Sequence, residues 1–314
     1  MNGATAKTND KRVVDSVLYN STISGPWRLT VWEKHGHPAS YIFSEEHASE
    51  GSCPDERDVS SILREILDGT VETEVFIEHF LHAEEIEHPR RPLSEACDAK
   101  SSSILNGLRL CLEVVKITST RHANRIHFCD PRCDIVSVMP DGKVYEAIHA
   151  YVQTLWRKGE VSDALLTLYE AFIHPLLSVV PDDKNMGGRL SGSIKKAREA
   201  MTDSQRAFFD QMWRRDVVTS VKDLTQTYTR MHDTQDISNV ADFMKQYTRT
   251  INKFMDSWLL AQMFHSENEG MSCSVLYLGS LHSLNMEKYL EAYGYSRTSI
   301  NENKNLTACL AVKT

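Results

Sequence analysis

The stretch "VLYLGSLHSLNMEKYLEAYGY", residues 275–295, constrains the fold more than any other part of this chain. It opens with an apolar run, Val275–Leu278, that has the length and character of a buried β-strand. Apolar side chains then recur at helical spacing, and Gly294 stands where such a helix ends. A buried strand that turns directly into a helix is typical of α/β folds, so this stretch predicts a sheet covered by helices.

Three other apolar segments predict further strands of the same sheet: Tyr41–Ser44, Glu74–Glu78 and Ile126–Cys129. A turn at residues 35–38 predicts a hairpin between "WRLTVWEK" and "ASYIFS". From Pro54 the pattern is that of a helix that ends at Gly69. The period is helical from residue 143 to residue 265, and its longest apolar stripe comprises Val240, Phe243, Met244, Tyr247, Ile251, Phe254, Met255 and Trp258.

Strands in both flanks of a helical middle predict one α/β unit that carries an insertion. We expect a central sheet flanked by helices, with a largely helical insertion in the second half. The predicted domains are an N-terminal extension over residues 1–26, an α/β core over 27–140 and 271–314, and the helical insertion over 141–270.

Composition and charge argue against several function classes. The 35 lysine and arginine residues are outnumbered by 43 aspartate and glutamate residues, which gives a formal net charge of −8. This balance, without a basic stripe that contains aromatic residues, disfavours nucleic-acid binding. No apolar run is long enough to span a bilayer, and the polar start "MNGATAKTNDKR" lacks the apolar core of a signal peptide. The seven cysteines are scattered and odd in number, so we expect a cytoplasmic location.

Residues that can carry chemistry gather where the predicted strands end. "YIFSEEH" ends in His47, in the same strand-then-helix context as His282. Chemistry in α/β folds collects at the carboxyl ends of strands, so we expect His47 and His282 to share one cleft. The other strand-end candidates are Glu45, Glu46, Glu78, His79, Asp130 and Arg132. Together they have the composition of a metal site or an acid–base site.

Taken in order, these motifs resemble a known group of proteins. An early G-x-x-H-like motif at 44–47, a strand-end Glu78 and a late G-x-x-H at 279–282, followed by a helix and "GY", resemble the TraB/TIKI group. "SEEH" also resembles the G-E-x-H motif of the erythromycin-esterase and ChaN-like superfamily. With "RIHFCDPR", the set is similar to uncharacterised proteins of large DNA viruses. The resemblance covers roughly residues 27–138 and 273–295, and it departs from the family pattern where Ser44 replaces glycine.

The resemblance implies a metal-dependent hydrolase that cleaves a peptide or ester bond. A divalent ion would be held by His47, His282 and a carboxylate, either Glu78 or Glu45, and would polarise a water and a substrate carbonyl. In a metal-free alternative, as in the esterase branch, His47 is the general base and Glu45 orients its ring. Haem binding, as in the ChaN-like branch, is a third alternative.

Charged residues near the motifs have two interpretations. Asp130 and Arg132 bind substrate, or they pair with each other. Arg121, Arg125 or Arg132 could hold an anionic group of the substrate, because a guanidinium binds carboxylate or phosphate through paired hydrogen bonds.

A non-catalytic hypothesis uses the same features. Ser44 and the large helical insertion favour an inactive scaffold that acts as a viral structural or host-interaction protein. The acidic surface and the long helices of the insertion suit protein partners, whereas the hydrolase hypothesis requires a small molecule or a peptide as substrate. Neither hypothesis involves nucleic acid or a membrane.

Overall fold

The computed structural model describes residues 3–19, 21–45, 57–80, 122–130, 142–180, 189–303 and 309–313. The described residues fall into two compact units. Unit 1 is built from the described parts of Met1–Phe80, Glu87–Cys129 and Gln262–Thr314, and unit 2 from those of Asp130–Ala261. The corresponding boundaries predicted from the sequence lie near residues 140 and 270.

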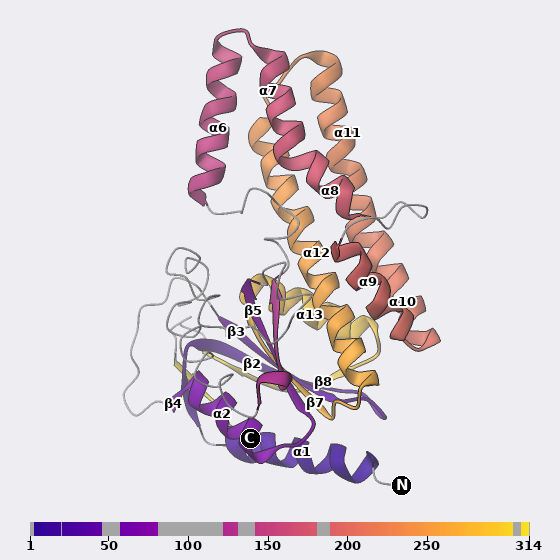
Figure 1. Cartoon of the computed structure of the whole chain (residues 1–314). Coiled ribbons are helices and arrows are strands. Elements are labelled where there is room, and N and C mark those ends of the chain that lie inside the picture. Colours follow the sequence, from indigo (N-terminus) through magenta and orange to yellow (C-terminus); the bar gives the residue numbers. More distant parts are fainter. Residues whose placement is uncertain are drawn as a thin grey trace. The chain divides into compact units, whose positions relative to one another are not determined.

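Six of the described strands form one sheet in the order β6-β5-β7-β3-β2-β8. Figure 1 shows this sheet with most of its strands labelled. The strands are β2 (Pro26–Glu33), β3 (Ala39–Glu45), β5 (Thr73–Phe80), β6 (Ile126–Asp130), β7 (Cys273–Gly279) and β8 (Ser296–Glu302). All four strands that the sequence predicts for a common sheet lie in it. The predicted α/β fold, with a central sheet flanked by helices, is therefore confirmed.

The central strand β7 explains why the sheet has this order. β7 pairs in parallel with β3 on one side and with β5 on the other. Every residue of β7 is buried, as expected for a parallel strand covered on both faces. The predicted hairpin is present, because β2 and β3 pair antiparallel. β8 then extends the sheet antiparallel to β2, with an irregular step in register between Val31 and Trp32.

One face of the sheet packs against α1 (Gly3–Leu18) and α2 (Val59–Gly69), which Figure 1 shows together on one side of it. The core of unit 1 lies between this face of the sheet and the two helices. The strands contribute to it Leu29, Val31, Tyr41, Phe43, Val75, Ile77, Val275 and Tyr277. We call this side the α1–α2 face. The two helices approach each other closely at Gly69, where an added Cβ would lie 2.7 Å from Val13 Cγ1.

The opposite side of the sheet faces α13 (Ser280–Ala292), and we call it the α13 face. Arg28 of β2 donates two hydrogen bonds to the carboxylate of Glu287 on α13, at 2.6 and 2.9 Å. Thr30 Oγ1 donates a third to the same carboxylate, at 2.9 Å. All three residues are buried, so this network fixes α13 against β2.

No element is predicted from the sequence before residue 27, but the structure has two. Besides α1, strand β1 (Thr22–Ser24) forms a small sheet with β4 (Arg57–Asp58) and β9 (Cys309–Ala311). The predicted helix after Pro54 begins at Val59, because Arg57 and Asp58 pair with β1. The start of the chain is thus part of the core of unit 1, to which α1 contributes Val14, Val17 and Leu18.

A buried carboxylate on α1 ties this helix to two strands of the sheet. Asp10 Oδ2 accepts hydrogen bonds from Ser272 Oγ at 2.7 Å, from the N–H of Glu72 at 2.8 Å and from Thr73 Oγ1 at 3.3 Å. Its other oxygen accepts from the N–H of Val71 at 3.4 Å. Asp10 is 2% exposed, and these donors replace the water that its charge loses on burial.

Unit 2 is helical, as the period of the sequence predicts. Its helices are α6 (Gly142–Arg157), α7 (Val161–Leu168), α8 (His174–Val179), α9 (Arg189–Ala200), α10 (Asp203–Trp213), α11 (Thr219–Thr234) and the part of α12 (Val240–Asn268) up to Ala261. Short π-helical turns, Tyr169–Ile173 and Arg214–Val218, join α7 to α8 and α10 to α11. Every member of the predicted α12 stripe is buried, and Phe172 packs edge-on against Tyr247 with ring centres 4.6 Å apart.

No helix in the described part of the chain combines the length and the apolar character that a membrane span requires.

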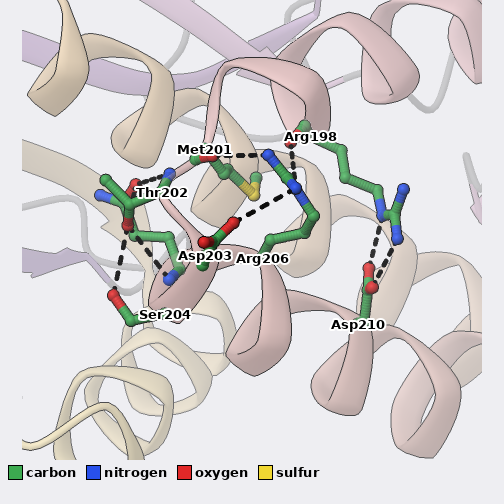
Figure 2. Close-up of polar contacts among 8 residues, drawn as sticks. Arg198, Met201, Thr202, Asp203, Ser204, Arg206 and Asp210 are labelled. Carbon is green, nitrogen blue, oxygen red and sulfur yellow. Dashed lines mark hydrogen bonds and ion pairs between the residues drawn. The ribbon is translucent and has the colours of Figure 1, made fainter.

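The corner between α9 and α10 shows how unit 2 reverses its chain direction (Figure 2). Thr202 and Gln205 form a capping box: the Thr202 hydroxyl accepts from the Gln205 N–H, and the Gln205 side chain accepts from the Thr202 N–H. Arg206 donates to the carbonyl of Met201 at 2.9 Å, at the end of α9. Arg198 and Asp210 then link the two helices through two hydrogen bonds of 2.6 Å.

We expect Asp10→Ala to lower the free energy of unfolding by about 3 kcal/mol, because it leaves several buried donors without an acceptor. Urea denaturation followed by circular dichroism measures the change. Lys11→Ala is the control: Lys11 pairs with Asp15 at the half-exposed surface, so its loss should cost less than about 1 kcal/mol. Equal effects of the two substitutions would contradict the role given to Asp10.

We expect Thr202→Ala to destabilise unit 2 by about 1 kcal/mol, because it removes the hydroxyl that caps α10. Amide hydrogen exchange of α10 residues measures this locally. Ser204→Ala is the matched control, since its exposed hydroxyl contacts Thr202 Oγ1 at 3.2 Å and no other hydrogen-bonding group in the described part of the chain. Exchange rates unchanged in Thr202→Ala would show that the capping box does not stabilise the corner.

Candidate functional site

The ends of three neighbouring parallel strands meet at one edge of the sheet. The register of β3 and β7 places Ser44 beside Leu278 and Glu45 beside Gly279. On the other side of β7, Ile77 of β5 lies beside Tyr277, so Glu78 follows at the same level as Leu278. The carboxyl ends of β3, β5 and β7 therefore form a common edge, as the sequence analysis expects.

Glu78 joins this edge to the start of α13. Its Oε2 accepts a hydrogen bond of 2.6 Å from the N–H of Gly279, the residue that precedes α13. Its Oε1 lies 3.5 Å from Nε2 of His282 in the first turn of the helix. Glu78 and His282 are 2% and 4% exposed. A carboxylate is favourable at this position because the N–H groups at the start of a helix carry partial positive charge.

Two side chains hold the first turn of α13 in place. Ser280 Oγ donates a hydrogen bond to the carbonyl of Glu45 at 2.9 Å, which links the ends of α13 and β3. Trp27 Nε1 donates to the same hydroxyl at 2.9 Å. Neither Ser280 nor Trp27 is predicted as a site residue from the sequence, because a serine after a glycine and a tryptophan in a strand carry no distinctive pattern.

Side chains alternate between the two faces of the sheet along each strand. This alternation places the two carboxylates predicted as metal ligands, Glu45 and Glu78, on opposite faces. Arg28 and Thr30 face α13, and they pair with Ser44 and Ile42 of β3. Ser44 and, through the common register, Glu78 therefore project to the α13 face. Glu45 follows Tyr41 and Phe43 in alternation, so it projects to the α1–α2 face. Of the two carboxylates, Glu78 is the one on the same side as His282.

Ser44, which stands where the family has glycine, lies in regular strand structure. Its backbone does not have positive φ; among the described residues other than glycine, only Gln235 does. A serine is therefore unstrained here, and the position does not require glycine. Ser44 is 1% exposed, and its hydroxyl has no hydrogen-bond partner among the residues that the structure describes.

Several predicted site residues lie outside the described residues. His47, Glu46 and Arg132 are among them, so the predicted approach of His47 to His282 stays a prediction. Asp130, predicted to bind substrate, is the last residue of β6 and is 1% exposed. His79 lies in β5 next to Glu78, but its side chain is not described.

The separation of Glu78 and His282 tests whether this pair fits a metal. A good side-chain hydrogen bond is shorter than 3.5 Å. Two ligands of one tetrahedral zinc ion, with bonds of about 2.1 Å, stand about 3.4 Å apart. The carboxylate oxygen and the imidazole nitrogen thus have both the chemistry and the spacing of a ligand pair. The described residues contain no cluster of three His, Cys, Asp or Glu side chains suited to a metal, so a complete site would need a ligand from the rest of the chain.

Arg125, one of three arginines considered for an anionic substrate, has a structural role. Its guanidinium donates to the carbonyls of Leu67 and Thr70 at the end of α2. It also contacts His122 Nδ1 at 2.8 Å, and His122 Nε2 lies 2.6 Å from Asp68. A cation at the C-terminus of a helix stabilises the carbonyls there, so these contacts give Arg125 a structural role, and substrate binding by this residue stays a prediction.

A second carboxylate–imidazole pair lies on the α13 face, nearer the amino end of β5. Glu74 Oε2 is 2.7 Å from Nε2 of His127 on β6. Burial, the largest single influence, raises the pKa of the Glu74 carboxyl. The hydrogen bond and charge of His127, the hydrogen bond of Ser266 and the charge of His265 outweigh it, so the pKa lies below its ordinary value of 4.5.

Comparison of the chain with protein-family models, with curated proteins and with solved structures finds no match. The resemblance to the TraB/TIKI group therefore rests on the motifs alone.

The lowered pKa of Glu74 makes a pH-dependent contribution to stability. Because the folded pKa is below the unfolded one, the contribution is present above pH 4.5 and is lost as pH falls through the folded pKa. We expect Glu74→Gln to be less stable than wild type near pH 6, and the difference to shrink towards about pH 2. Thermal melts across this range measure it. A difference that is constant with pH would contradict the ionic role of Glu74.

Proposed function

We propose that this protein is a metal-dependent hydrolase of the TraB/TIKI-like type that cleaves a peptide or ester bond, and that Glu78 and His282 belong to its active site. The observation that carries the proposal is the 3.5 Å separation between Glu78 Oε1 and His282 Nε2 at the carboxyl edge of the sheet. This spacing suits two ligands of one ion better than a hydrogen bond.

In this proposal His47 is the third ligand, as its motif predicts. A bound divalent ion would lower the pKa of a water and polarise the substrate carbonyl. The chain's own residues have separate tasks. Gly279 N–H holds Oε2 of Glu78, while Oε1 lies 3.5 Å from His282 Nε2. Ser280 fixes the first turn of α13, and with it the position of the imidazole. Substrate recognition by Arg132 and Asp130 stays a prediction.

A second candidate is the inactive scaffold, acting as a viral structural or host-interaction protein in the cytoplasm. The observation that favours it is the burial of Glu78 and His282, together with the hydrogen bond that Glu78 already accepts from the Gly279 N–H at the start of α13. On this hypothesis Glu78 and His282 contribute only to the stability of the fold. The helices of unit 2 would then present the surface for protein partners.

Metal content and activity distinguish these candidates. We expect the purified full chain to bind a divalent ion, and His282→Ala to lose most of it because one of three ligands is gone. Activity on a panel of peptides and esters should fall at least ~100-fold after chelation or in His282→Ala, and should return in wild type when the metal is added back. His37→Ala is the matched control, because His37 forms a Glu–His pair with Glu267, at 2.7 Å, elsewhere in unit 1.

Glu78→Gln separates a catalytic from a structural role. The amide oxygen can still accept the hydrogen bond from Gly279, so the melting temperature should change little, while metal affinity should fall with the lost charge. Activity that does not respond to chelation would refute the metal-dependent mechanism. Absence of activity with every metal tested, together with equal metal content in wild type and His282→Ala, would favour the scaffold.

A further inference from the structure

β8 (Ser296–Glu302) is the end strand of the six-stranded sheet, and no described strand pairs with its outer edge. Such an edge presents unpaired N–H and C=O groups that can pair with another strand. Native edge strands are often protected by lysine, proline or a bulge; "SRTSINE" contains no lysine or proline, and its one irregularity is the bulge at Thr298. Most of its side chains are exposed. The strand therefore has the backbone and the surface that a further strand would need.

A bulge decides which side chains of β8 share a face. Its pairs with β2 are Glu302 with Arg28, Asn301 with Leu29, Ile300 with Thr30, Ser299 with Val31 and Arg297 with Trp32. Thr298 is the extra residue. Without the bulge, Arg297 and Glu302 would project to opposite faces of the sheet, because successive side chains of a strand alternate and these two residues are an odd number of positions apart. With it, Arg297, Ile300 and Glu302 all project to the α13 face.

These three side chains are placed for contact with a partner. Ile300 is 46% exposed, which is unusual for a large apolar residue in a strand. The Arg297 guanidinium lies 5.9 Å from the centre of the Trp32 ring, which orients it. Glu302 is exposed. No ion pair joins Arg297 or Glu302 to another residue in the described ranges.

We propose that β8 pairs antiparallel with β8 of a second copy of this chain, so that two sheets continue into one across a two-fold axis. Counted along the ladder with β2, which skips Thr298, Ile300 lies two positions from Arg297 and two positions from Glu302. With the axis at this residue, Ile300 packs against Ile300 of the second copy. Arg297 then lies opposite Glu302 of the second copy, and the same pair occurs twice because the interface is isologous.

The order of charges along β8 indicates that the strand that pairs with its outer edge is β8 of a second copy. Along the α13 face, β8 carries a cation, an apolar residue and an anion. An antiparallel copy presents the same series reversed, so each charge meets its opposite. A parallel copy would place like charges together, which is unfavourable in directly opposed positions. The strand is thus complementary to itself in one orientation only.

Analytical ultracentrifugation of the full chain from about 1 µM to about 1 mM tests the dimer. We expect a concentration-dependent dimer, and Ile300→Lys should weaken it at least tenfold, since it brings two ammonium groups together at the axis. Val71→Lys is the control: Val71 is 78% exposed but lies outside β8, so the dimer should be unchanged. A wild-type chain that stays monomeric throughout the range would overturn the proposal.

A charge exchange tests the register. Arg297→Glu and Glu302→Arg should each weaken the homodimer about tenfold, because each variant opposes like charges at two positions. Mixing the two variants should restore association, since every opposed pair is then of opposite charge. Circular dichroism verifies that each variant is folded. Homodimers that are as tight as wild type, or a mixture that associates no better than its components, would overturn the proposed pairing.

Discussion

The buried carboxylate of Glu287 determines where α13 lies, and the candidate site depends on that helix. A carboxylate taken out of water is costly unless donors replace the lost solvent, and Arg28 and Thr30 supply three hydrogen bonds. Such a network adds little net stability compared with an apolar contact of the same shape, but any other placement of α13 would leave a charge unpaired. We infer that its main effect is to specify one position for the helix.

The fold was predictable for those elements whose local pattern of apolar residues matches the faces that the structure buries. The strands β3, β5, β6 and β7 are short, mainly apolar runs, as is typical of strands in a largely buried sheet, and β3, β5 and β7 pair in parallel. The α12 stripe was predictable for the same reason, because residues at helical spacing can be buried together only on one face. The start of the chain was not predictable, because α1 is polar in its first half. This helix is held by Asp10, whose partners are a residue of β5 and residues that directly precede β5 and β7.

The candidate site was predictable in its residue types but not in its pairings. Glu78 and Gly279 are separated by 201 positions in sequence, and Arg28 and Glu287 by 259. No local pattern encodes such contacts; they follow from the order of strands in the sheet. Glu45 and Glu78 are equal candidates in the sequence, and only the register shows that they project to opposite faces. For Arg125 the sequence indicated a cation near strand ends, but not that the carbonyls of α2 would bind it.

The sheet has two kinds of edge, and the two proposals use different ones. The chemistry is assigned to the carboxyl ends of β5 and β7, whereas association is assigned to the lateral edge of β8, which β2 and β3 separate from β7. Pairing through β8 would extend the hydrogen-bond ladder sideways and would leave the strand ends unchanged. Each protomer of such a dimer would keep its own Glu78 and His282. Loss of the dimer should therefore leave metal binding intact, and loss of the metal should leave the dimer intact, so each proposal can fail without the other.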